Sequence, residues 1–382
     1  MLSKTDVLTI FVTAMAKDNM KLSGNERIYG LDVYRAIAIV LVVLSHGAAL
    51  AGDIFWFLPT VPVLSGIDGV ELFFVLSGFL IGSILIKEID KREKFNLKSI
   101  AHFWKRRWFR TLPNYYLILL LNFLFIQYEL KNGDLDQFGW SFIFFTHNLF
   151  DGFHSFFWES WSLSVEEWFY IILPLSIFGF RLFLSKKHTF LATILLLIIA
   201  PLLYRIYHAE AVYNTFNAYD IEVRKVVVMR LDTIIYGVFA AYIKYYFKDF
   251  WRLCRWPAFI LGMAILYLGT TTNHSFELFY SRTFYFVLIS IGAMFLLPLA
   301  DSIKTYRVKW WGKTVTHISK ISYSMYLINL GLVYGVIIKL NPPEAEADRW
   351  QMYTLFWCVT VGASTLLYYF FERPMMKLRD RF

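Results

Sequence analysis

Residues 32–50 read DVYRAIAIVLVVLSHGAAL, a nearly unbroken apolar run that contains one arginine and one histidine. At 1.5 Å per residue, a helix of this length matches the thickness of the hydrocarbon core of a bilayer. Nine similar runs follow, at 70–86, 112–128, 161–180, 190–206, 226–243, 256–272, 283–300, 321–340 and 351–371. We therefore predict an all-α polytopic membrane protein with about ten transmembrane helices.

The composition of the chain supports this prediction. Of its 382 residues, 58% are hydrophobic and 18% are charged, whereas a soluble domain has about 45–50% apolar and about 25% charged residues. This composition excludes a disordered or collagen-like chain, and two cysteines cannot build a disulfide framework. Because no spacing of His and Cys residues suits zinc, we predict that the protein holds no metal.

The loops between the predicted spans alternate in charge. Loops rich in Lys and Arg lie at 87–110, 181–187, 244–255, 304–320 and 373–381. The loops on the opposite side are acidic or polar, as at 129–159 and 344–349. Lys and Arg accumulate in cytoplasmic loops, so we predict that both termini are cytoplasmic. The net charge of +9 then reflects membrane topology, and we expect no nucleic-acid partner.

The two ends of the chain are predicted to lie outside the membrane domain. Lys4, the apolar run 7–12 and the small residues 14–16 imitate a short signal peptide. Cleavage there would leave the new N-terminus outside, against the charge pattern, so we favour an interfacial segment over 1–27. The membrane domain is then predicted over 28–374, followed by a basic cytoplasmic tail over 375–382.

Arg35 and His46 are the polar residues of the first span. Eleven residues at 100° each bring them within about 20° of the same helix face, with a rise of roughly 16 Å between them. One face of this helix is therefore expected to present a cation near the cytoplasm and an imidazole in the outer half. Ionisable groups inside a membrane usually mark functional sites, although a snorkelling arginine and a hydrogen-bonded histidine would be the structural alternative.

Four other charged positions are expected at the same outer-half level as His46. Glu71 opens the second span, and Arg230 and Asp232 lie in the sixth. In the fourth span Glu166 and Glu167 are adjacent and point 100° apart, so only one is expected to face the bundle interior. The alternative interpretation of these groups is a structural network of ion pairs.

Two further patterns predict packing and ligand contacts. Gly78 and Gly82 form a small-xxx-small face that suits close contact with another helix. The segment 102–113, HFWKRRWFRTLP, precedes the third span, and its proline suits the first turn of a helix. If the helix extends backwards, Arg107 and Arg110 share a face. With Lys105 and Arg106 they would provide four cations beside two tryptophans, a set able to bind a phosphorylated ligand and stack its base, and Arg35 lies on the same side. The positive-inside rule alone would also place cations here.

Seven pieces of the sequence, in order, resemble the membrane-bound acyltransferase 3 family over about 28–374. They are Arg35 with His46, segment 71–82, the Arg-rich entry to the third span, Trp161-Ser162-Leu163 with Glu166 and Phe169-Tyr170, Arg230-Leu231-Asp232 with Gly237, Ile321-Ser322-Tyr323-Ser324-Met325-Tyr326-Leu327, and Phe371-Glu372-Arg373-Pro374. Such proteins move acyl groups, usually acetyl from acetyl-CoA, to carbohydrates outside the cytoplasm. The resemblance thus implies a multi-pass enzyme of the bacterial cytoplasmic (inner) membrane that O-acetylates envelope polysaccharides.

The resemblance also implies roles for individual residues. His46 matches the family's essential histidine, and other functionally important polar positions match Arg35, Glu71, Arg107, Arg110 and Glu166. Members often have His where this chain has Asn329, so a hydrogen-bonding role is expected there rather than proton transfer. Contacts to a carbohydrate or glycolipid acceptor are predicted for Ser162, Arg230, Asp232 and Asn329.

These assignments give a mechanistic hypothesis. In this hypothesis, the phosphates of acyl-CoA would be held by Arg35, Arg106, Arg107 and Arg110 while its thin pantetheine arm reaches His46. His46, with an ordinary pKa of about 6.5, would act as general base toward an acceptor hydroxyl, and Glu166 or Glu71 would fix its tautomer. A route through an acyl-histidine intermediate stays open. The competing functions are a proton-coupled transporter that uses the same His/Glu/Arg cluster and a scaffold protein, which would need no intramembrane charges.

Overall fold

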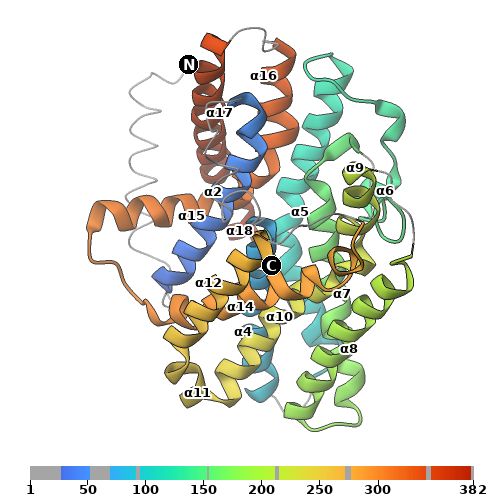
Figure 1. Cartoon of the computed structure of the whole chain (residues 1–382), viewed down its shortest axis with the longest axis vertical. Coiled ribbons are helices and arrows are strands. Elements are labelled where there is room, and N and C mark those ends of the chain that lie inside the picture. Colours follow the sequence, from blue (N-terminus) through green and yellow to red (C-terminus); the bar gives the residue numbers. More distant parts are fainter. Residues whose placement is uncertain are drawn as a thin grey trace.

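The computed structural model describes residues 27–51, 69–91, 95–152, 155–210, 215–271, 277–340 and 346–379. All regular elements in these ranges are helical (Figure 1). The longer helices are α2 (Tyr29–Ala51), α4 (Gly69–Lys91), α5 (Leu97–Gln127), α7 (Ser160–Arg181), α8 (Lys186–Tyr207), α10 (Leu231–Tyr246), α12 (Arg255–Thr271), α14 (Tyr285–Ser302), α15 (Lys309–Ile328) and α17 (Glu346–Leu367). Short helices between or after them include α6 (Trp140–Ile143), α9 (Phe216–Tyr219), α11 (Lys248–Leu253), α13 (Phe279–Arg282), α16 (Gly335–Leu340) and α18 (Arg373–Arg379).

Each of the ten predicted spans overlaps one of these helices. Eight helical segments in the described ranges are long and apolar enough to cross a membrane. In two of them π-helical turns join neighbouring helices: η6 (Asn329–Tyr334) connects α15 to α16, and η7 (Tyr368–Glu372) connects α17 to α18. The other two predicted spans correspond to α10 and α12, which have 16 and 17 residues. The chain is thus an all-α, multi-pass integral membrane protein.

The predicted ends of the chain are only partly described. Of the predicted interfacial segment 1–27, only Arg27 lies within the described residues. The last three residues, 380–382, also lie outside them, while 375–379 belong to α18.

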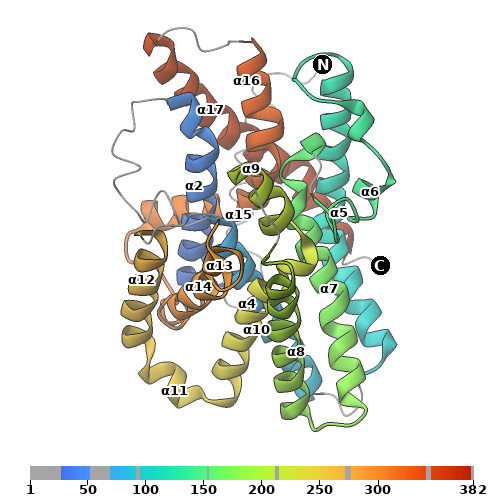
Figure 2. The ribbon, with the colours of Figure 1, turned by 45° about the vertical axis from the view of Figure 1, so that its right-hand side comes forward.

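The third span begins much earlier than predicted. Helix α5 starts at Leu97, where the Asn96 side chain accepts a hydrogen bond from the Ser99 N–H, and it runs along the long axis of the molecule (Figure 2). Pro113 therefore lies inside the helix and not in its first turn, so that prediction was wrong. The residues before the proline continue the helix because a capping Asn precedes them. A proline inside a transmembrane helix is tolerated when neighbouring groups satisfy the freed carbonyl. The backward extension places Arg107 and Arg110 on α5.

Helices α4 and α10 touch through glycines, as the small-residue face predicted. A methyl group added at Gly78 would meet the main-chain oxygen of Ile234, and one added at Gly237 would meet the main-chain oxygen of Val75. Gly82 faces Val238 in the same seam, where an added Cβ would lie 2.9 Å from the Val238 Cα. The two backbones are therefore in direct contact, and no larger side chain fits between them.

Replacing a seam glycine should destabilise the protein. We expect Gly237→Ala to lower the free energy of unfolding by about 1–3 kcal/mol, since the methyl group meets main-chain atoms that cannot move aside. The matched control is Gly179→Ala, because nothing lies within 4 Å of a Cβ added at Gly179 in α7. Thermal unfolding of the purified variants in detergent measures the difference. Equal melting temperatures for the two variants would contradict the direct contact between the backbones.

Candidate active site

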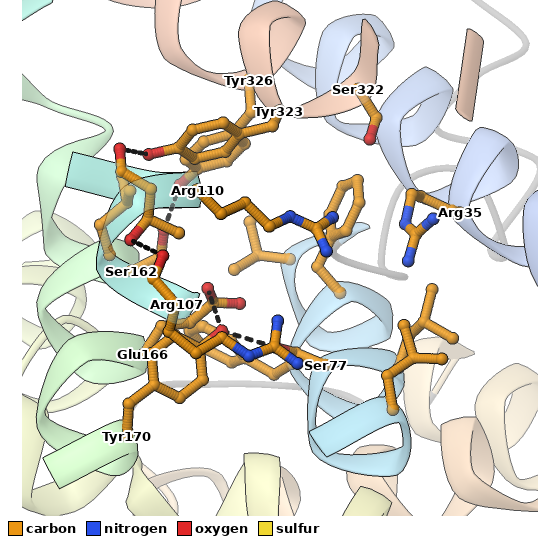
Figure 3. A pocket seen from close by; sticks show the side chains of 17 residues that line it. Arg35, Ser77, Arg107, Arg110, Ser162, Glu166, Tyr170, Ser322, Tyr323 and Tyr326 are labelled. Atoms are coloured by element: carbon orange, nitrogen blue, oxygen red, sulfur yellow. Dashed lines mark hydrogen bonds between the residues drawn. The ribbon is translucent and has the colours of Figure 1, made fainter. Parts of the chain in front are cut away.

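A cavity of about 110 Å³ lies among α2, α4, α5, α7 and α15 (Figure 3). Its polar lining consists of Arg35, Ser77, Arg107, Arg110, Thr111, Ser162, Glu166, Tyr170, Ser322, Tyr323 and Tyr326. The fold thus brings together five predicted site residues: Arg35 of α2, Arg107 and Arg110 of α5, and Ser162 and Glu166 of α7. Arg106 is exposed on α5 and does not line the cavity.

Three arginines supply an excess of positive charge to this cavity. The Arg35, Arg107 and Arg110 guanidinium groups point toward its interior (Figure 3). Within the described part of the chain, Arg110 has neither a hydrogen bond nor an ion pair. Glu166 is the only carboxylate of the lining. Guanidinium groups that protein carboxylates neutralise only in part suit an anion with several oxygens, such as a phosphate.

The other two arginines are partly engaged by protein groups. Arg107 lies over the Tyr170 ring, with its Cζ 5.6 Å from the ring centroid. Arg35 lies on α2, where its Nη1 is 3.9 Å from the Asp32 carboxylate. That carboxylate is shared with Arg27, at 2.5 Å, so it does not neutralise Arg35 fully.

The two tryptophans of the Arg-rich segment do not form part of the cavity lining. Trp104 and Trp108 stack on each other, with ring centroids 5.7 Å apart, and the Trp104 indole N–H donates to the Tyr170 carbonyl at 2.8 Å. Trp104 therefore links α5 to α7, and neither tryptophan lines the cavity.

Both adjacent carboxylates of α7 lie inside the bundle, which corrects the expectation that only one would. Glu166 accepts a hydrogen bond from the Tyr170 hydroxyl at 2.9 Å, and this hydroxyl lies 2.9 Å from the Ser77 Oγ of α4. Glu167 accepts from the Thr111 hydroxyl of α5 at 2.7 Å. Glu166 is linked through Tyr170 to Ser77 of α4, and Glu167 is bonded to Thr111 of α5, so both directions point into the bundle.

His46 is held by Asn329. The His46 Nδ1 lies 2.6 Å from the Asn329 Oδ1, and the Asn329 amide nitrogen donates to the carbonyls of Met325 and Tyr326 at 2.9 and 2.8 Å. Because the amide nitrogen is already engaged, the amide oxygen faces the imidazole and must accept the Nδ1 proton. This leaves the Nε2 lone pair of His46 free to act as a base.

The partner of His46 is thus an amide and not a carboxylate. Neither Glu166 nor Glu71, which we expected to fix the tautomer, has a hydrogen bond to His46 in the described structure. The cavity reaches His46 indirectly, because Tyr326 lines its wall and Asn329 lies one helical turn further along the same chain segment.

The position of Asn329 depends on Glu159, whose role the sequence did not reveal. Asn329 begins the π-helix η6, and the Glu159 Oε1 accepts the N–H groups of Leu330 and Gly331 at 3.1 and 2.6 Å. The side chain is buried, close to the buried Lys131. Burial lowers the pKa of Lys131, whereas the nearby Glu159 carboxylate opposes this change. The only sequence signal for Glu159 was its place immediately before the fourth span.

Glu71, Arg230 and Asp232 lie in buried ion pairs away from the cavity. Arg230 pairs with Glu71, and Asp232 pairs with Arg205 at 2.5 Å. The Arg205 and Asp232 side chains are completely buried. Arg205 was missed, although it is the only charged residue of the apolar run 190–206. This arrangement agrees with the structural alternative for these groups.

The expected outer-half cluster around His46 is therefore not formed. Helix α4 starts opposite the middle of α2: a Cβ added at Gly69, its first residue, would meet the Ala38 carbonyl oxygen. Glu71 consequently lies nearer to Arg35 than the sequence indicated, and Glu166 lies with the arginines. In the described residues, no group of three or more His, Cys, Asp or Glu side chains could hold a metal ion.

Comparison of the sequence with known proteins identifies the family of this chain. Residues 28–372 match the acyltransferase 3 family, described as an acyltransferase domain. The chain is 26% identical over 370 residues to the O-acetyltransferase OatA of Staphylococcus aureus strain NCTC 8325 / PS 47, and equally to that of strain COL. These alignments cover 91% of this chain and 57% of each relative, so the chain spans little more than half their length. No solved structure matches the chain. Since the match extends over nearly all of its residues, the chain belongs to the acyltransferase 3 family.

Proposed function

We propose that this protein is an O-acetyltransferase that moves an acetyl group from cytoplasmic acetyl-CoA to a hydroxyl of an extracytoplasmic or lipid-linked carbohydrate. The observation that carries the proposal is the arginine-lined cavity whose wall lies one helical turn from the residue that holds His46. The family supports acyl transfer, and the relatives are named O-acetyltransferases.

The donor is expected to bind with its phosphates at the arginines. Arg35, Arg107 and Arg110 would contact the phosphate oxygens, and the exposed Arg106 would attract the anion from outside the cavity. The thin pantetheine arm, and not the bulky nucleotide, is expected to enter this cavity of about 110 Å³. The nucleotide would therefore stay at the mouth while the thioester approaches Tyr326 and Ser162.

His46 would supply the base for the transfer step. The Nε2 takes the proton of the acceptor hydroxyl while the oxygen attacks the thioester carbonyl, the C–O bond forms and the C–S bond breaks. The proton then passes to the leaving CoA thiolate. The Asn329 oxygen holds the Nδ1 proton and so fixes the ring without adding a negative charge, in contrast to the carboxylate of a Ser-His-Asp triad. A route through an acetyl-histidine would use the same nitrogen as nucleophile.

Glu166 is proposed to order the donor site. It lies beside Arg107 and Arg110 and is bonded to Tyr170, so its charge offsets part of the arginine repulsion before the donor binds. Ser162, whose Oγ lies 2.6 Å from the Tyr326 hydroxyl, would contact the thioester end. Glu71, Arg230 and Asp232 would contribute through the buried ion pairs that hold α4, α8 and α10 together.

The test is consumption of the thioester. Purified protein in lipid nanodiscs is mixed with radiolabelled acetyl-CoA and an envelope glycan fraction, and labelled ester and free CoA are measured together. An acetyltransferase forms both in equal amounts. A proton-coupled transporter would move solute without releasing CoA, and that result would refute the proposal.

Glu159 should influence the reaction through the position of Asn329. We expect Glu159→Gln to lower kcat several-fold to about tenfold with little change in the KM for acetyl-CoA, because a neutral acceptor holds the two N–H groups of η6 less strongly than a carboxylate does. The control is Glu222→Gln, which makes the same carboxylate-to-amide replacement at an exposed position. An effect on donor KM alone would place Glu159 at the donor site instead.

The transfer direction requires cytoplasmic termini. In a background with Cys254 and Cys358 replaced by Ser, a cysteine at Lys377 should react with a membrane-impermeant maleimide only after cells are opened. A cysteine at Asp136, in the acidic loop, should react in intact cells. The reverse labelling pattern would show that the positive-inside prediction of the orientation is wrong.

A further inference from the structure

A second cation-rich cavity lies apart from the arginine-lined one, between the ends of α4, α10 and α14 and beside α11. Its volume is about 530 Å³. Six cationic side chains line it: Lys87, Lys244, Lys248, Arg252, Arg255 and Lys304. These residues belong to the loops predicted to face the cytoplasm.

Protein groups neutralise only part of this charge. Asp301 is the one acid of the lining, and its carboxylate lies 2.7 Å from the Lys244 Nζ and 3.7 Å from the Lys304 Nζ. The Trp251 indole N–H also donates to it, at 3.2 Å. Within the described ranges, Lys87, Arg252 and Arg255 have neither hydrogen bonds nor ion pairs with the protein. Three cations are thus available to an anion from outside.

An apolar groove of about 230 Å³ adjoins this cavity. The two share Trp251 and Pro298, so one opens beside the other. Between α10, α12 and α14 the groove is lined by Ile243, Pro257, Ala258, Leu261, Met294 and Phe295. At its edges Phe250 and Leu261 are 58% and 51% exposed, which leaves the groove open to the surface of the bundle.

We propose that the cationic cavity and the apolar groove form one binding site for an anionic phospholipid. The phosphate-bearing headgroup contacts Lys87, Arg252 and Arg255, and an acyl chain lies in the groove beside Ala258. The positive-inside rule explains cations in these loops but not an adjoining apolar groove. A soluble phosphorylated ligand would leave that groove unfilled, whereas a lipid with a charged head and an apolar tail matches both parts.

Native mass spectrometry of the detergent-solubilised full chain tests the proposal, with phosphatidylglycerol and phosphatidylcholine of equal chain length as probes. Phosphatidylglycerol should bind more tightly and raise the melting temperature. The combined variant Lys87→Gln, Arg252→Gln and Arg255→Gln should bind phosphatidylglycerol about a hundredfold more weakly. This factor is about 2.8 kcal/mol at 1.4 kcal/mol per tenfold, near the contribution of three cations at an anionic surface. Melting without lipid checks that the variant is folded.

Matched variants separate a defined site from general surface charge. The combined variant Arg307→Gln, Lys309→Gln and Lys313→Gln removes the same charge from exposed positions outside the cavity and should bind the lipid like the parent. Ala258→Trp fills the groove and should weaken binding, while Ala264→Trp, exposed on the same helix, should not.

Several outcomes would overturn the proposal. Equal binding of the two lipids, or an equal loss in both triple variants, would show non-specific charge attraction. Unchanged affinity in Ala258→Trp would exclude the groove as the tail site. Displacement of the lipid by CoA alone would assign the cations to the donor. Because none of these measurements depends on acetyl transfer, the lipid site and the proposed enzymatic activity can fail separately.

Discussion

His46→Ala is expected to abolish acetyl transfer while the protein stays folded and inserted in the membrane. Loss of a general base lowers rates by about 10²- to 10⁴-fold, and the expected reduction lies at the upper end if the same nitrogen also carries the acetyl group. The imidazole is only half-buried and has one hydrogen-bond partner, Asn329. Its truncation therefore affects stability far less than catalysis. Turnover of radiolabelled acetyl-CoA by the purified variant measures the effect.

The sharper comparison is His46→Gln, which keeps a donor for the Asn329 oxygen but has no useful basicity. It should be as inactive as His46→Ala while its melting temperature stays close to that of the parent. Acetyl transfer at more than a tenth of the parent rate in a well-folded His46→Gln protein would remove proton abstraction by His46 from the mechanism.

Arg110→Ala is expected to weaken the binding of the CoA donor by about tenfold to a hundredfold. This range corresponds to about 1.5–3 kcal/mol for a lost charge-assisted hydrogen bond. Arg110 has the largest expected effect among the cavity arginines because its guanidinium group has no protein partner among the described residues. Saturating acetyl-CoA should restore much of the rate, since Arg110 is proposed to contact the donor phosphates and has no hydrogen bond to the base. Calorimetry with CoA, beside turnover, measures both quantities.

The matched control for Arg110 is Arg106→Ala on the same helix. Both variants remove one positive charge four residues apart, but Arg106 is exposed and does not line the cavity. Its loss should change CoA affinity less than threefold in 150 mM salt, where surface charges are largely screened. Equal effects at the two positions would mean that the arginines act only through the charge of the cytoplasmic surface.

Glu166→Gln, at the donor site, should change CoA affinity more than it changes the rate at saturation.

The sequence alone predicted the helices and the positions of Arg35 and His46 on one of them. These predictions depend on local properties, namely hydrophobic length and helical periodicity, and α2 is continuous from Tyr29 to Ala51. The close contact at Gly78 was also predictable, because small residues four apart permit backbone contact. The beginning of α5 was not predicted, since the charged residues before Pro113 were interpreted as a loop.

The pairings between charged residues could not be predicted. His46 and its partner Asn329 are 283 residues apart, and Glu71 and Arg230 are 159 apart. The prediction assumed that α2 and α4 cross the same depth of membrane. Because α4 instead starts opposite the middle of α2, Glu71 lies far from the level of His46. Glu159 acts through main-chain N–H groups of a π-helix, and no residue pattern in the sequence revealed that turn.

The glycine contacts have a consequence for the donor of the proposed reaction. Gly30 meets the main chain of Ala300, Gly69 meets that of Ala38, and Gly78 meets that of Ile234. Backbones in such contact cannot slide without driving side chains into the main chain, so α2, α4, α10 and α14 form one inflexible frame. Arg35 and His46 both lie on α2, one of these four helices, with a rise of roughly 16 Å between them. Under the proposed mechanism, this separation would limit which donors can react: a carrier arm of matching length would bring its carbonyl to the imidazole, and a shorter arm would not reach it. The proposed enzyme would therefore select the carrier arm of its donor before it selects the acyl group.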